Sequence, residues 1–201
     1  MDADRPDATS VAACLPPGRG AFIAVVGPSG AGKDSILDKV RATRDVSDVR
    51  FVRRLITRPA GAGGEDHQPV SAEAFDAAQA SGALVLWWRA HDLAYGIPAE
   101  TRTWVEDGLI VVANLSRSVL ADALDRFPRL IAVNVTCDAS VLAGRLAARG
   151  RESAEDVSRR LKRDVPLGIG EERVYRIENS ADLDVAADRF AALIEAVRAT
   201  Q

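Results

Sequence analysis

AFIAVVGPSGAGKDSILDKV, residues 21–40, predicts a strand, a glycine-rich loop and a helix in direct succession. Ala21–Val26 is a short, uniformly apolar run followed by a Gly/Ser cluster, which favours a buried strand over a helix. Ser35 to about Arg44 places apolar residues at helical spacing, namely Ile36, Leu37 and Val40. The chemistry of the protein is therefore expected at the loop that joins these two elements.

The loop has the G-x-x-x-x-G-K spacing of a phosphate-binding loop and reads Gly27-Pro28-Ser29-Gly30-Ala31-Gly32-Lys33. Its glycines let backbone N–H groups turn inward around phosphate oxygens, and the helix N-terminus adds partial positive charge. Lys33 is one of only three lysines in the chain, and its ammonium would neutralise charge on the β- and γ-phosphates. We expect this loop, with Asp34 and Ser35, to bind ATP, and Lys33 to be catalytic.

Magnesium is expected from the chemistry of ATP, but its protein ligands stay open. Asp34 stands where such loops usually carry a Ser or Thr that holds the metal, and Ser35 follows it. Asp34 either binds magnesium, directly or through water, or stabilises the helix N-terminus. Asn114 follows the predicted strand 109–113, where many related proteins have a second acid.

Further apolar runs predict strands over 51–56, 83–88, 109–113, 130–135 and 173–177. Helices are predicted over 72–80, 98–107, 117–127 and 138–149, then from 153 to just before 166, and over 183–197. Strands that alternate with helices indicate an α/β fold of three layers, a parallel sheet covered by helices on both faces. Residues 1–20 mix Asp, Pro, Ala and Gly without a period, so we expect a flexible extension before a single domain, 21–201.

Composition excludes several classes of protein. The chain has 201 residues, 47% of them hydrophobic, and a net charge of −3, so no bulk positive charge attracts nucleic acid or a membrane surface. No apolar run could span a bilayer and no secretory signal is recognisable, so we expect a cytoplasmic protein. Cys14 and Cys137 stand far apart in the sequence, so they indicate neither a disulfide framework nor a metal site. The two histidines lack the further ligands that a metal site needs. The sequence leaves a homodimer open.

Basic residues gather in two segments instead. Residues 39–58 hold seven basic and two acidic side chains, and residues 145–163 hold seven basic and three acidic ones. Because a guanidinium group can bind phosphate oxygens two at a time, these segments indicate focused anion sites.

Four motifs occur in a specific order: GPSGAGKDS at 27–35; ITR at 56–58 with GEDH at 64–67; WRAHDLAYGIP at 88–98; and RLAARGRE at 145–152 with RRL at 159–161. Together they resemble the guanylate kinase family and, more closely, its ribose 1,5-bisphosphate phosphokinase branch. The resemblance implies a substrate-binding segment over about 51–98 and a helical lid over about 140–165. Arg145, Arg149 and Arg160 match lid arginines that surround the transferring phosphoryl group, and the first two share one helix face.

The same resemblance implies roles around the two substrates. Arg58 and Tyr95 match residues that hold the phosphate of the acceptor, and Asn179 matches a position near adenine. His91 and Arg89 are our candidates for the hydroxyls and the second phosphate of a sugar.

The acceptor is predicted from two missing acids. Guanylate kinases read guanine with a glutamate and an aspartate, and this chain has Leu86 and Asn114 at those positions. Guanine N–H donors would be left unpaired, which is costly, so guanine is disfavoured and a phosphorylated sugar without a base fits better. The phosphokinase resemblance implies that this sugar is a bisphosphate. The expected reaction is phosphorylation of ribose 1,5-bisphosphate by ATP to give 5-phospho-α-D-ribose 1-diphosphate and ADP. A guanylate or other small-metabolite kinase, and a non-catalytic protein-binding module, are the alternatives.

Overall fold

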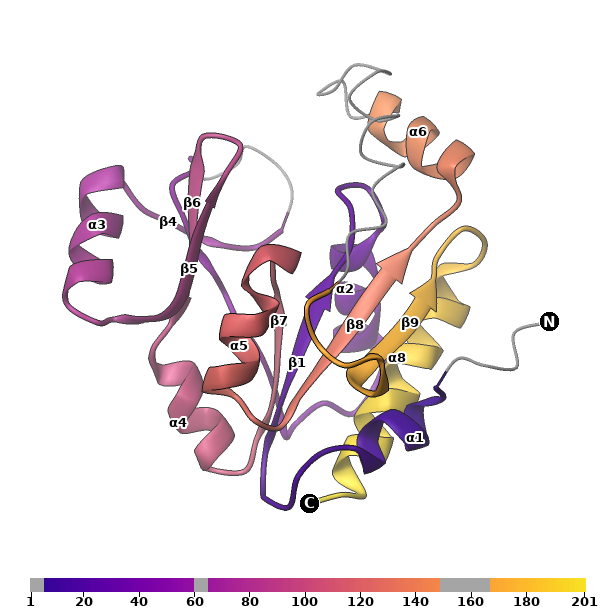
Figure 1. Cartoon of the computed structure of the whole chain (residues 1–201). Helices are drawn as coiled ribbons and strands as arrows, with labels where there is room; N and C mark the ends of the chain where they lie inside the picture. Colours follow the sequence, from indigo (N-terminus) through magenta and orange to yellow (C-terminus); the bar gives the residue numbers. More distant parts are fainter. Residues whose placement is uncertain (1–5, 60–64, 149–166) are drawn as a thin grey trace.

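A five-stranded parallel sheet forms the centre of the protein in the computed structural model, which describes residues 6–59, 65–148 and 167–201 (Figure 1). Its strands are β1 Ala21–Val26, β2 Val49–Phe51, β7 Ile110–Asn114, β8 Leu130–Thr136 and β9 Val174–Glu178, in the order β2-β7-β1-β8-β9. Each neighbouring pair is parallel. The predicted α/β class and parallel sheet are confirmed.

Successive side chains along each strand point to opposite faces of the sheet, and both faces are apolar. Helices therefore cover both faces. On one face, Ile23 and Val25 pack in a core with α2 Lys33–Thr43 and α8 Leu183–Arg198. On the other, Phe22 and Ala24 pack with α5 Leu120–Arg126, the 3-10 turn η1 Arg117–Val119, and part of α4 Glu100–Glu106. The carboxyl ends of all five strands lie at one edge of the sheet, where α6 Ala139–Ala148 follows β8.

A second, four-stranded sheet lies beside the first and was not predicted. It contains β3 Leu55–Ile56, β4 Gln68–Pro69, β5 Leu84–Ala90 and β6 Leu93–Pro98, in the order β4-β3-β6-β5. Strands β5 and β6 form an antiparallel hairpin, and α3 Ala72–Ala80 packs against one face of it through Phe75. The opposite face, which includes Trp88 and Ile97, joins the core of the central sheet.

The predicted strand over 51–56 is wrong in one respect, because the chain changes sheets within it. Phe51 ends β2 in the central sheet, whereas Leu55 begins β3 in the second sheet. The predicted helix over 98–107 is shorter, because β6 extends through Pro98. The predicted helix from 153 lies outside the described residues.

The predicted flexible extension is also wrong over its described part, residues 6–20. Ala8–Ala13 forms helix α1, which packs on α8 with Val11 fully buried. Arg129, itself buried, donates from Nε to the carbonyl oxygen of Gly20 at 2.7 Å and from Nη1 to that of Pro16. The segment is held by apolar burial and by this arginine, neither of which its own composition reveals.

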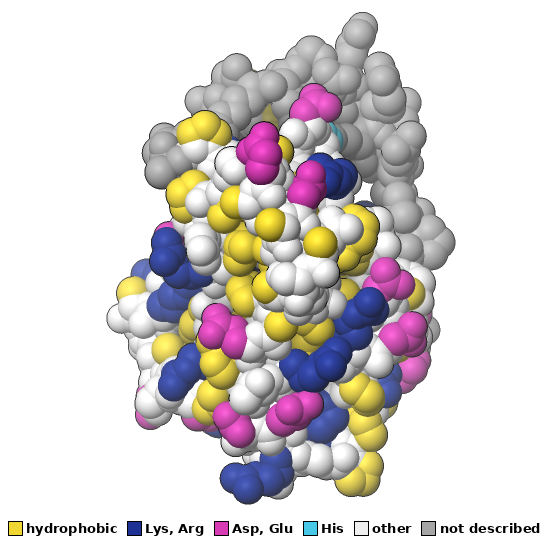
Figure 2. All heavy atoms as spheres, turned by 90° about the vertical axis from the view of Figure 1, so that its left-hand side faces the viewer, with side chains coloured by type: hydrophobic (Ala, Val, Ile, Leu, Met, Phe, Trp, Pro, Cys, Tyr) yellow, Lys and Arg dark blue, Asp and Glu magenta, His cyan; other side chains and the backbone are white. Residues whose placement is uncertain are grey.

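On the face that carries α3 and α4, basic, acidic and apolar side chains are interspersed (Figure 2). Among the described helices, none is long and apolar enough to cross a membrane.

Candidate active site

The phosphate-binding loop between β1 and α2 adopts a shape that requires glycine at two positions. Gly27 and Gly32 have φ angles of 146° and 88°. A Cβ on Gly27 would lie 2.3 Å from the carbonyl oxygen of Val135, and one on Gly32 would lie 2.2 Å from the amide nitrogen of Asn179. The loop backbone therefore lies directly against the ends of β8 and β9, and a larger residue at either position would displace it.

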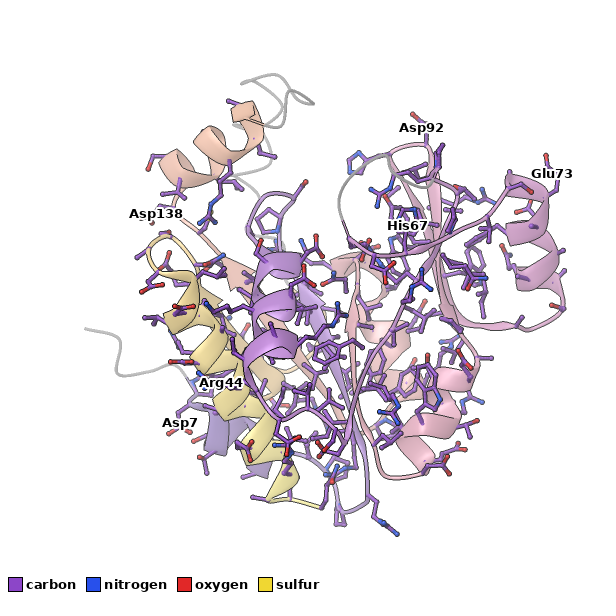
Figure 3. All side chains as sticks on the ribbon, turned by 180° about the vertical axis from the view of Figure 1, so that it is seen from behind. Asp7, Arg44, His67, Glu73, Asp92 and Asp138 are labelled. Carbon is purple, nitrogen blue, oxygen red and sulfur yellow. The ribbon has the colours of Figure 1, made fainter. Side chains whose placement is uncertain are left out.

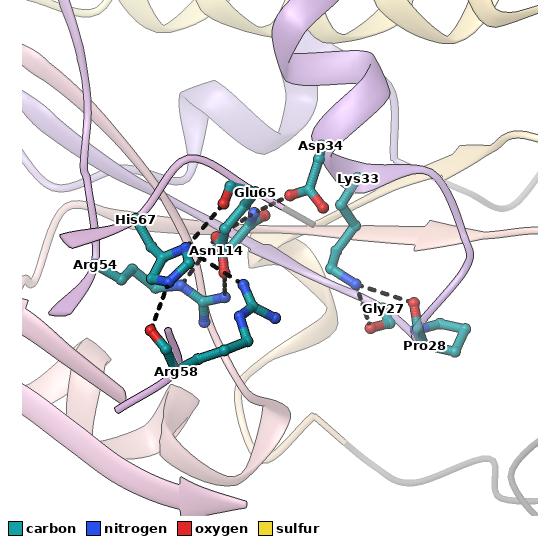
Figure 4. A network of polar contacts seen from close by, with 9 residues as sticks. All are labelled: Gly27, Pro28, Lys33, Asp34, Arg54, Arg58, Glu65, His67 and Asn114. Atoms are coloured by element: carbon teal, nitrogen blue, oxygen red, sulfur yellow. Dashed lines mark hydrogen bonds and ion pairs between the residues drawn. The ribbon is translucent and has the colours of Figure 1, made fainter. Parts of the chain in front are cut away.

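Lys33, the first residue of α2, folds back over this loop. Its Nζ donates to the carbonyl oxygens of Gly27 and Pro28, each at 2.9 Å (Figure 4). Neutral carbonyls are weaker partners for an ammonium than a phosphate is, because bonds between two charged groups are stronger. The lysine is therefore placed to exchange these carbonyls for an anionic ligand.

Burial lowers the pKa of Lys33 from 10.5 to about 8, and this loss of hydration is the largest cause. The carboxylates of Asp34 and Glu65 raise that pKa, while the guanidinium groups of Arg54 and Arg117 lower it further. Lys33 still carries its charge at neutral pH, in surroundings where two arginines repel it. Such a site gains electrostatic stability when an anion binds.

The opposite side of the loop is held by Asn179 and Arg145. The Asn179 side chain donates to the carbonyl oxygen of Ala31 at 2.8 Å, and Arg145 donates to the backbone oxygen of Asn179 at 2.9 Å. Leu142 of α6 is buried, and its methyl group lies 2.9 Å from where a Gly30 Cβ would be. Helix α6 thus packs closely on the loop. The Asn179 Oδ1 is buried without a partner among the described residues.

A polar network joins the loop to the second sheet (Figure 4). Asn114, the last residue of β7, donates from Nδ2 to Asp34 Oδ1 at 2.7 Å and to Glu65 Oε2 at 3.3 Å. Glu65 forms an ion pair with Arg54, whose Nε lies 3.1 Å from Oε2. Both charged side chains are largely buried, at 12% and 14% exposure, so removing either would leave an uncompensated charge.

Arg58 lies on the other side of this network, next to the buried His67. The two side chains approach to 3.5 Å between Nη2 and Nδ1, and the His67 ring nitrogens lie 3.0 Å and 3.1 Å from the backbone oxygens of Glu65 and Arg58. The Arg58 Nε is buried and has no partner among the described residues. His67 therefore positions Arg58, and the guanidinium retains donor capacity for a ligand.

Two aromatic rings lie beside Arg54 in the second sheet. Trp88 and Tyr95, paired across β5 and β6, stack with centroids 5.3 Å apart and planes 5° apart. The guanidinium carbon of Arg54 lies 5.0 Å from the Tyr95 ring and 5.4 Å from the Trp88 ring. These cation–π contacts and the ion pair hold Arg54 between the aromatic pair and Glu65.

Asp34 lies between two adjoining hollows. One is lined by loop residues, among them Ser29, Gly32, Lys33 and Ser35, and the other by Arg41, Val52, Glu65 and Asn114. A group bound at Asp34 would therefore be in reach of ligands in both.

Comparison with known proteins identifies the family. No family model matches the chain. It is 48% identical over 183 residues to the ribose 1,5-bisphosphate phosphokinase PhnN of Rhizobium etli, covering 90% of this chain and 92% of that protein. It is 44% identical to the protein of the same name from Ruegeria sp., covering 94% and 100%. The chain belongs to the ribose 1,5-bisphosphate phosphokinase PhnN family. The phosphokinase resemblance seen in the sequence motifs is confirmed.

Other matches extend this picture of the phosphokinase family. A bifunctional ribose 1,5-bisphosphokinase–thymidine phosphorylase of Cupriavidus pinatubonensis is 45% identical over 171 residues, which cover 85% of this chain and 28% of that longer protein. Among solved structures, guanylate kinase from Anaplasma phagocytophilum has a TM-score of 0.63 at 18% identity, covering 89% of this chain and 86% of its own. A gluconokinase from Sinorhizobium meliloti has a TM-score of 0.51, covering 92% and 97%. These structures establish the shared fold.

The structure brings several predicted residues of this phosphokinase together at the carboxyl edge of the central sheet. They are Lys33, Asp34, Arg145 and Asn179 around the loop, and Arg58 and Tyr95 toward the second sheet. In Figure 3, Asp138, which precedes α6, and His67 lie on opposite sides of the start of α2. The predicted lid residues Arg149 and Arg160 lie outside the described residues.

Arg89 is not brought to this group. Its guanidinium forms an ion pair with Asp76 of α3 at 2.7 Å and lies 5.9 Å from the Phe75 ring, on the face of the hairpin opposite Trp88. His91 has a positive φ of 51° at the turn between β5 and β6, beside Asp92, which marks the outer end of the hairpin in Figure 3. The role in sugar binding predicted for Arg89 is therefore inconsistent with its position.

Three charged residues of the site were not predicted: Arg54, Glu65 and Arg117. A usable signal existed only for Arg117, which follows a predicted parallel strand by four residues, at the sheet edge where ligands bind in such folds. Arg54 stands among other arginines in a basic segment, and its ion pair with Glu65 spans 11 positions of sequence. Only the folded chain distinguishes it from its neighbours.

Proposed function

We propose that this protein transfers the γ-phosphoryl group of ATP to the 1-phosphate of ribose 1,5-bisphosphate, forming 5-phospho-α-D-ribose 1-diphosphate and ADP. The observation that carries the proposal is the pairing of two cationic sites at one sheet edge. One surrounds the phosphate-binding loop with Lys33, and the other faces it from the second sheet with Arg58. Two small, highly anionic substrates suit this arrangement.

On the donor side, the loop backbone and Lys33 hold the triphosphate. Arg145 lies beside Asn179, close enough to the loop to approach the transferring group, and Arg149 and Arg160 are proposed to join it from the lid. Phosphoryl transfer depends on positioning and charge neutralisation more than on covalent help, so converging cations are the equipment it needs. The buried, unpaired Oδ1 of Asn179 supports its proposed place near adenine.

On the acceptor side, Arg58 and Tyr95 hold the 5-phosphate. The Nε of Arg58 is buried with no partner among the described residues, so the guanidinium keeps donor capacity that an anion could use, and Tyr95 presents a phenol at the aromatic pair beside Arg54. Leu86 is buried among apolar side chains, and Asn114 is engaged with Asp34 and Glu65. No carboxylate stands at Leu86 or Asn114 to accept guanine N–H donors, which disfavours GMP.

The residues present also fit a magnesium ion held mainly by ATP. Magnesium prefers oxygen ligands and often uses only one or two carboxylates plus phosphates. Asp34 offers a carboxylate in the hollow next to the loop, and the Oδ1 of Asn114 beside it is buried with no hydrogen-bond partner in the part of the chain that the structure describes. We assign Asp34 as the protein ligand, direct or through water. Bound magnesium neutralises charge on the β- and γ-phosphates during transfer.

The test compares kcat/KM for ribose 1,5-bisphosphate and for GMP at identical ATP and magnesium, followed by ADP release. We expect ribose 1,5-bisphosphate to be favoured by about a hundredfold or more, since guanine would bring unpaired donors into the site. Lys33→Ala serves as the inactive control. A ratio of kcat/KM that favours GMP would show that GMP is the acceptor. Tight ATP binding without turnover of GMP or ribose 1,5-bisphosphate would favour a non-catalytic binding module.

A further inference from the structure

Arg117 lies across the start of the phosphate-binding loop. It follows β7 by three residues, and its Nη2 donates to the Oδ1 of Asn134 in β8 at 3.3 Å. Because β1 lies between β7 and β8, this bond joins the segment after β7 to the strand on the other side of β1. Asn134 is in register with Val26, the residue before Gly27. The guanidinium is thus placed where the loop begins.

Arg117 and Asn134 meet on the face of the central sheet that packs against the second sheet. Asn134 shares its face with Ala132 and Leu130, because side chains alternate along a strand. Those residues belong to the core that also contains Trp88 and Ile97 of the second sheet. Helix α2 packs on the other face. Arg117 therefore approaches the loop from the side of the second sheet, whereas Lys33 reaches it from α2.

Among the described residues, no carboxylate pairs with Arg117. Within residues 6–59, 65–148 and 167–201, its hydrogen bond goes to a neutral amide, and its Nε is buried without a partner. Arg54, in contrast, is paired with Glu65. Lys33 lies close by, because its Nζ donates to the carbonyl oxygen of Gly27, the residue after Val26, and Val26 is the register partner of Asn134. Two cations that converge on this partly buried edge indicate that an anion binds between them.

We propose that Arg117 binds the phosphate of the acceptor that attacks ATP, and so forms a second acceptor-phosphate site in addition to Arg58 and Tyr95. This inference rests on the proposed function, in which the acceptor carries two phosphates. The 5-phosphate is held in the second sheet, and the 1-phosphate lies between Arg117 and the γ-phosphate. Arg117 is then a catalytic residue, since it contacts the attacking group.

The chemistry needs such a group. An oxygen of the acceptor phosphate dianion forms a bond to the γ-phosphorus, the bond from that phosphorus to the β–γ bridging oxygen breaks, and ADP leaves with the electron pair. The new diphosphate carries one more negative charge than the acceptor, so charge balances without any proton transfer. Two anions must meet, and a guanidinium beside both lowers the barrier that their repulsion would impose.

The test measures Arg117→Gln and Arg117→Lys against the matched control Arg126→Gln, which removes an exposed arginine of α5 whose bond goes to the carbonyl oxygen of Asp122. For Arg117→Gln we expect kcat/KM for the acceptor to fall about a hundredfold, with the Kd of MgATP alone changed less than about threefold. Arg117→Lys keeps the charge but not the planar fork, so about a tenfold loss is expected. Arg126→Gln should match the wild type.

Normal acceptor kinetics in both Arg117 variants would overturn the inference, as would a loss of MgATP affinity equal to the loss in kcat/KM. Thermal unfolding of each variant separates loss of the fold from loss of binding, and Arg117→Lys remains decisive if Arg117→Gln does not fold. A wild-type protein that phosphorylates only GMP would overturn the proposed function instead. The same variants measured with GMP would then decide the role of Arg117, because GMP also offers a phosphate as acceptor.

Discussion

Binding of MgATP should be accompanied by proton uptake at Lys33. Burial lowers the pKa of this lysine to about 8 in the ligand-free protein, so about half of the molecules carry a neutral Lys33 at pH 8. A triphosphate beside Nζ favours the charged form and raises that pKa well above 8. Binding at pH 8 should therefore take up about half a proton per site, against about 0.1 at pH 7 and about 0.9 at pH 9.

The same equilibrium predicts how affinity changes with pH. If the bound lysine stays charged throughout, the apparent Kd of MgATP should rise about tenfold between pH 7 and pH 9. Weaker folding would not explain that rise. The unfolded lysine keeps its proton up to about pH 10.5, so the unfolded state binds more protons between pH 8 and 10.5, and this group makes the ligand-free protein more stable as pH rises through that window.

Calorimetry of MgATP binding without acceptor, repeated in buffers of different ionisation enthalpy, measures the proton uptake directly. Lys33→Met is the matched control, because it keeps the length of the chain without a titratable group, and its uptake at pH 8 should be near zero. The reasoning would be refuted by zero uptake in the wild type at both pH 8 and pH 9, or by equal uptake in wild type and Lys33→Met.

Three further changes have expected outcomes. Gly32→Ala should weaken MgATP binding at least tenfold by calorimetry, because the new Cβ would lie 2.2 Å from the Asn179 amide at a φ of 88°; unchanged affinity would show that the loop tolerates displacement. Val11→Ala should lower the free energy of unfolding in urea by about 2 kcal/mol while kcat is kept, since a fully buried side chain loses two methyl groups; no destabilisation would mean that α1 does not pack in solution. Glu65→Gln should lower the free energy of unfolding by about 3 kcal/mol and raise the acceptor KM, because the largely buried Arg54 loses its counter-charge; unchanged values of both would show that the pair is dispensable.

The central sheet could be predicted because buried parallel strands are continuous apolar runs. Ala21–Val26, Ile110–Asn114 and Leu130–Thr136 are nearly buried along their whole length, and each stands out in the sequence. The second sheet lacks that signal. Its strands β3 and β4 contain two residues each, and β6 contains a glycine and a proline. Such strands are stabilised by their neighbours in the sheet rather than by their own composition.

The site was predictable to the extent that local spacing defines it. The loop with Lys33 is a contiguous motif, and Arg145 and Asn179 follow from the family resemblance. Arg54 and Arg117 acquire their roles from contacts with Glu65 and Asn134, 11 and 17 positions away. A basic residue in sequence gives no sign of whether a carboxylate neutralises it. Arg54 is paired with Glu65, whereas Arg117 bonds to the neutral Asn134 and has no carboxylate partner among the described residues.

The second sheet is one uninterrupted insertion into the central fold. The chain leaves the central sheet after Phe51, builds β3 through β6, and returns at α4, so residues 55–98 have two covalent junctions with the rest of the protein and pack on it through Trp88 and Ile97. In evolutionary terms this makes the acceptor side a cassette: recombination at the two junctions could replace Arg58 and Tyr95 together while every strand around the phosphate-binding loop stays in place. Asn114 and Arg117 lie outside the cassette, at the edge of the central sheet. A new acceptor could thus be acquired by exchanging one segment and adjusting those two positions, without rebuilding the ATP site.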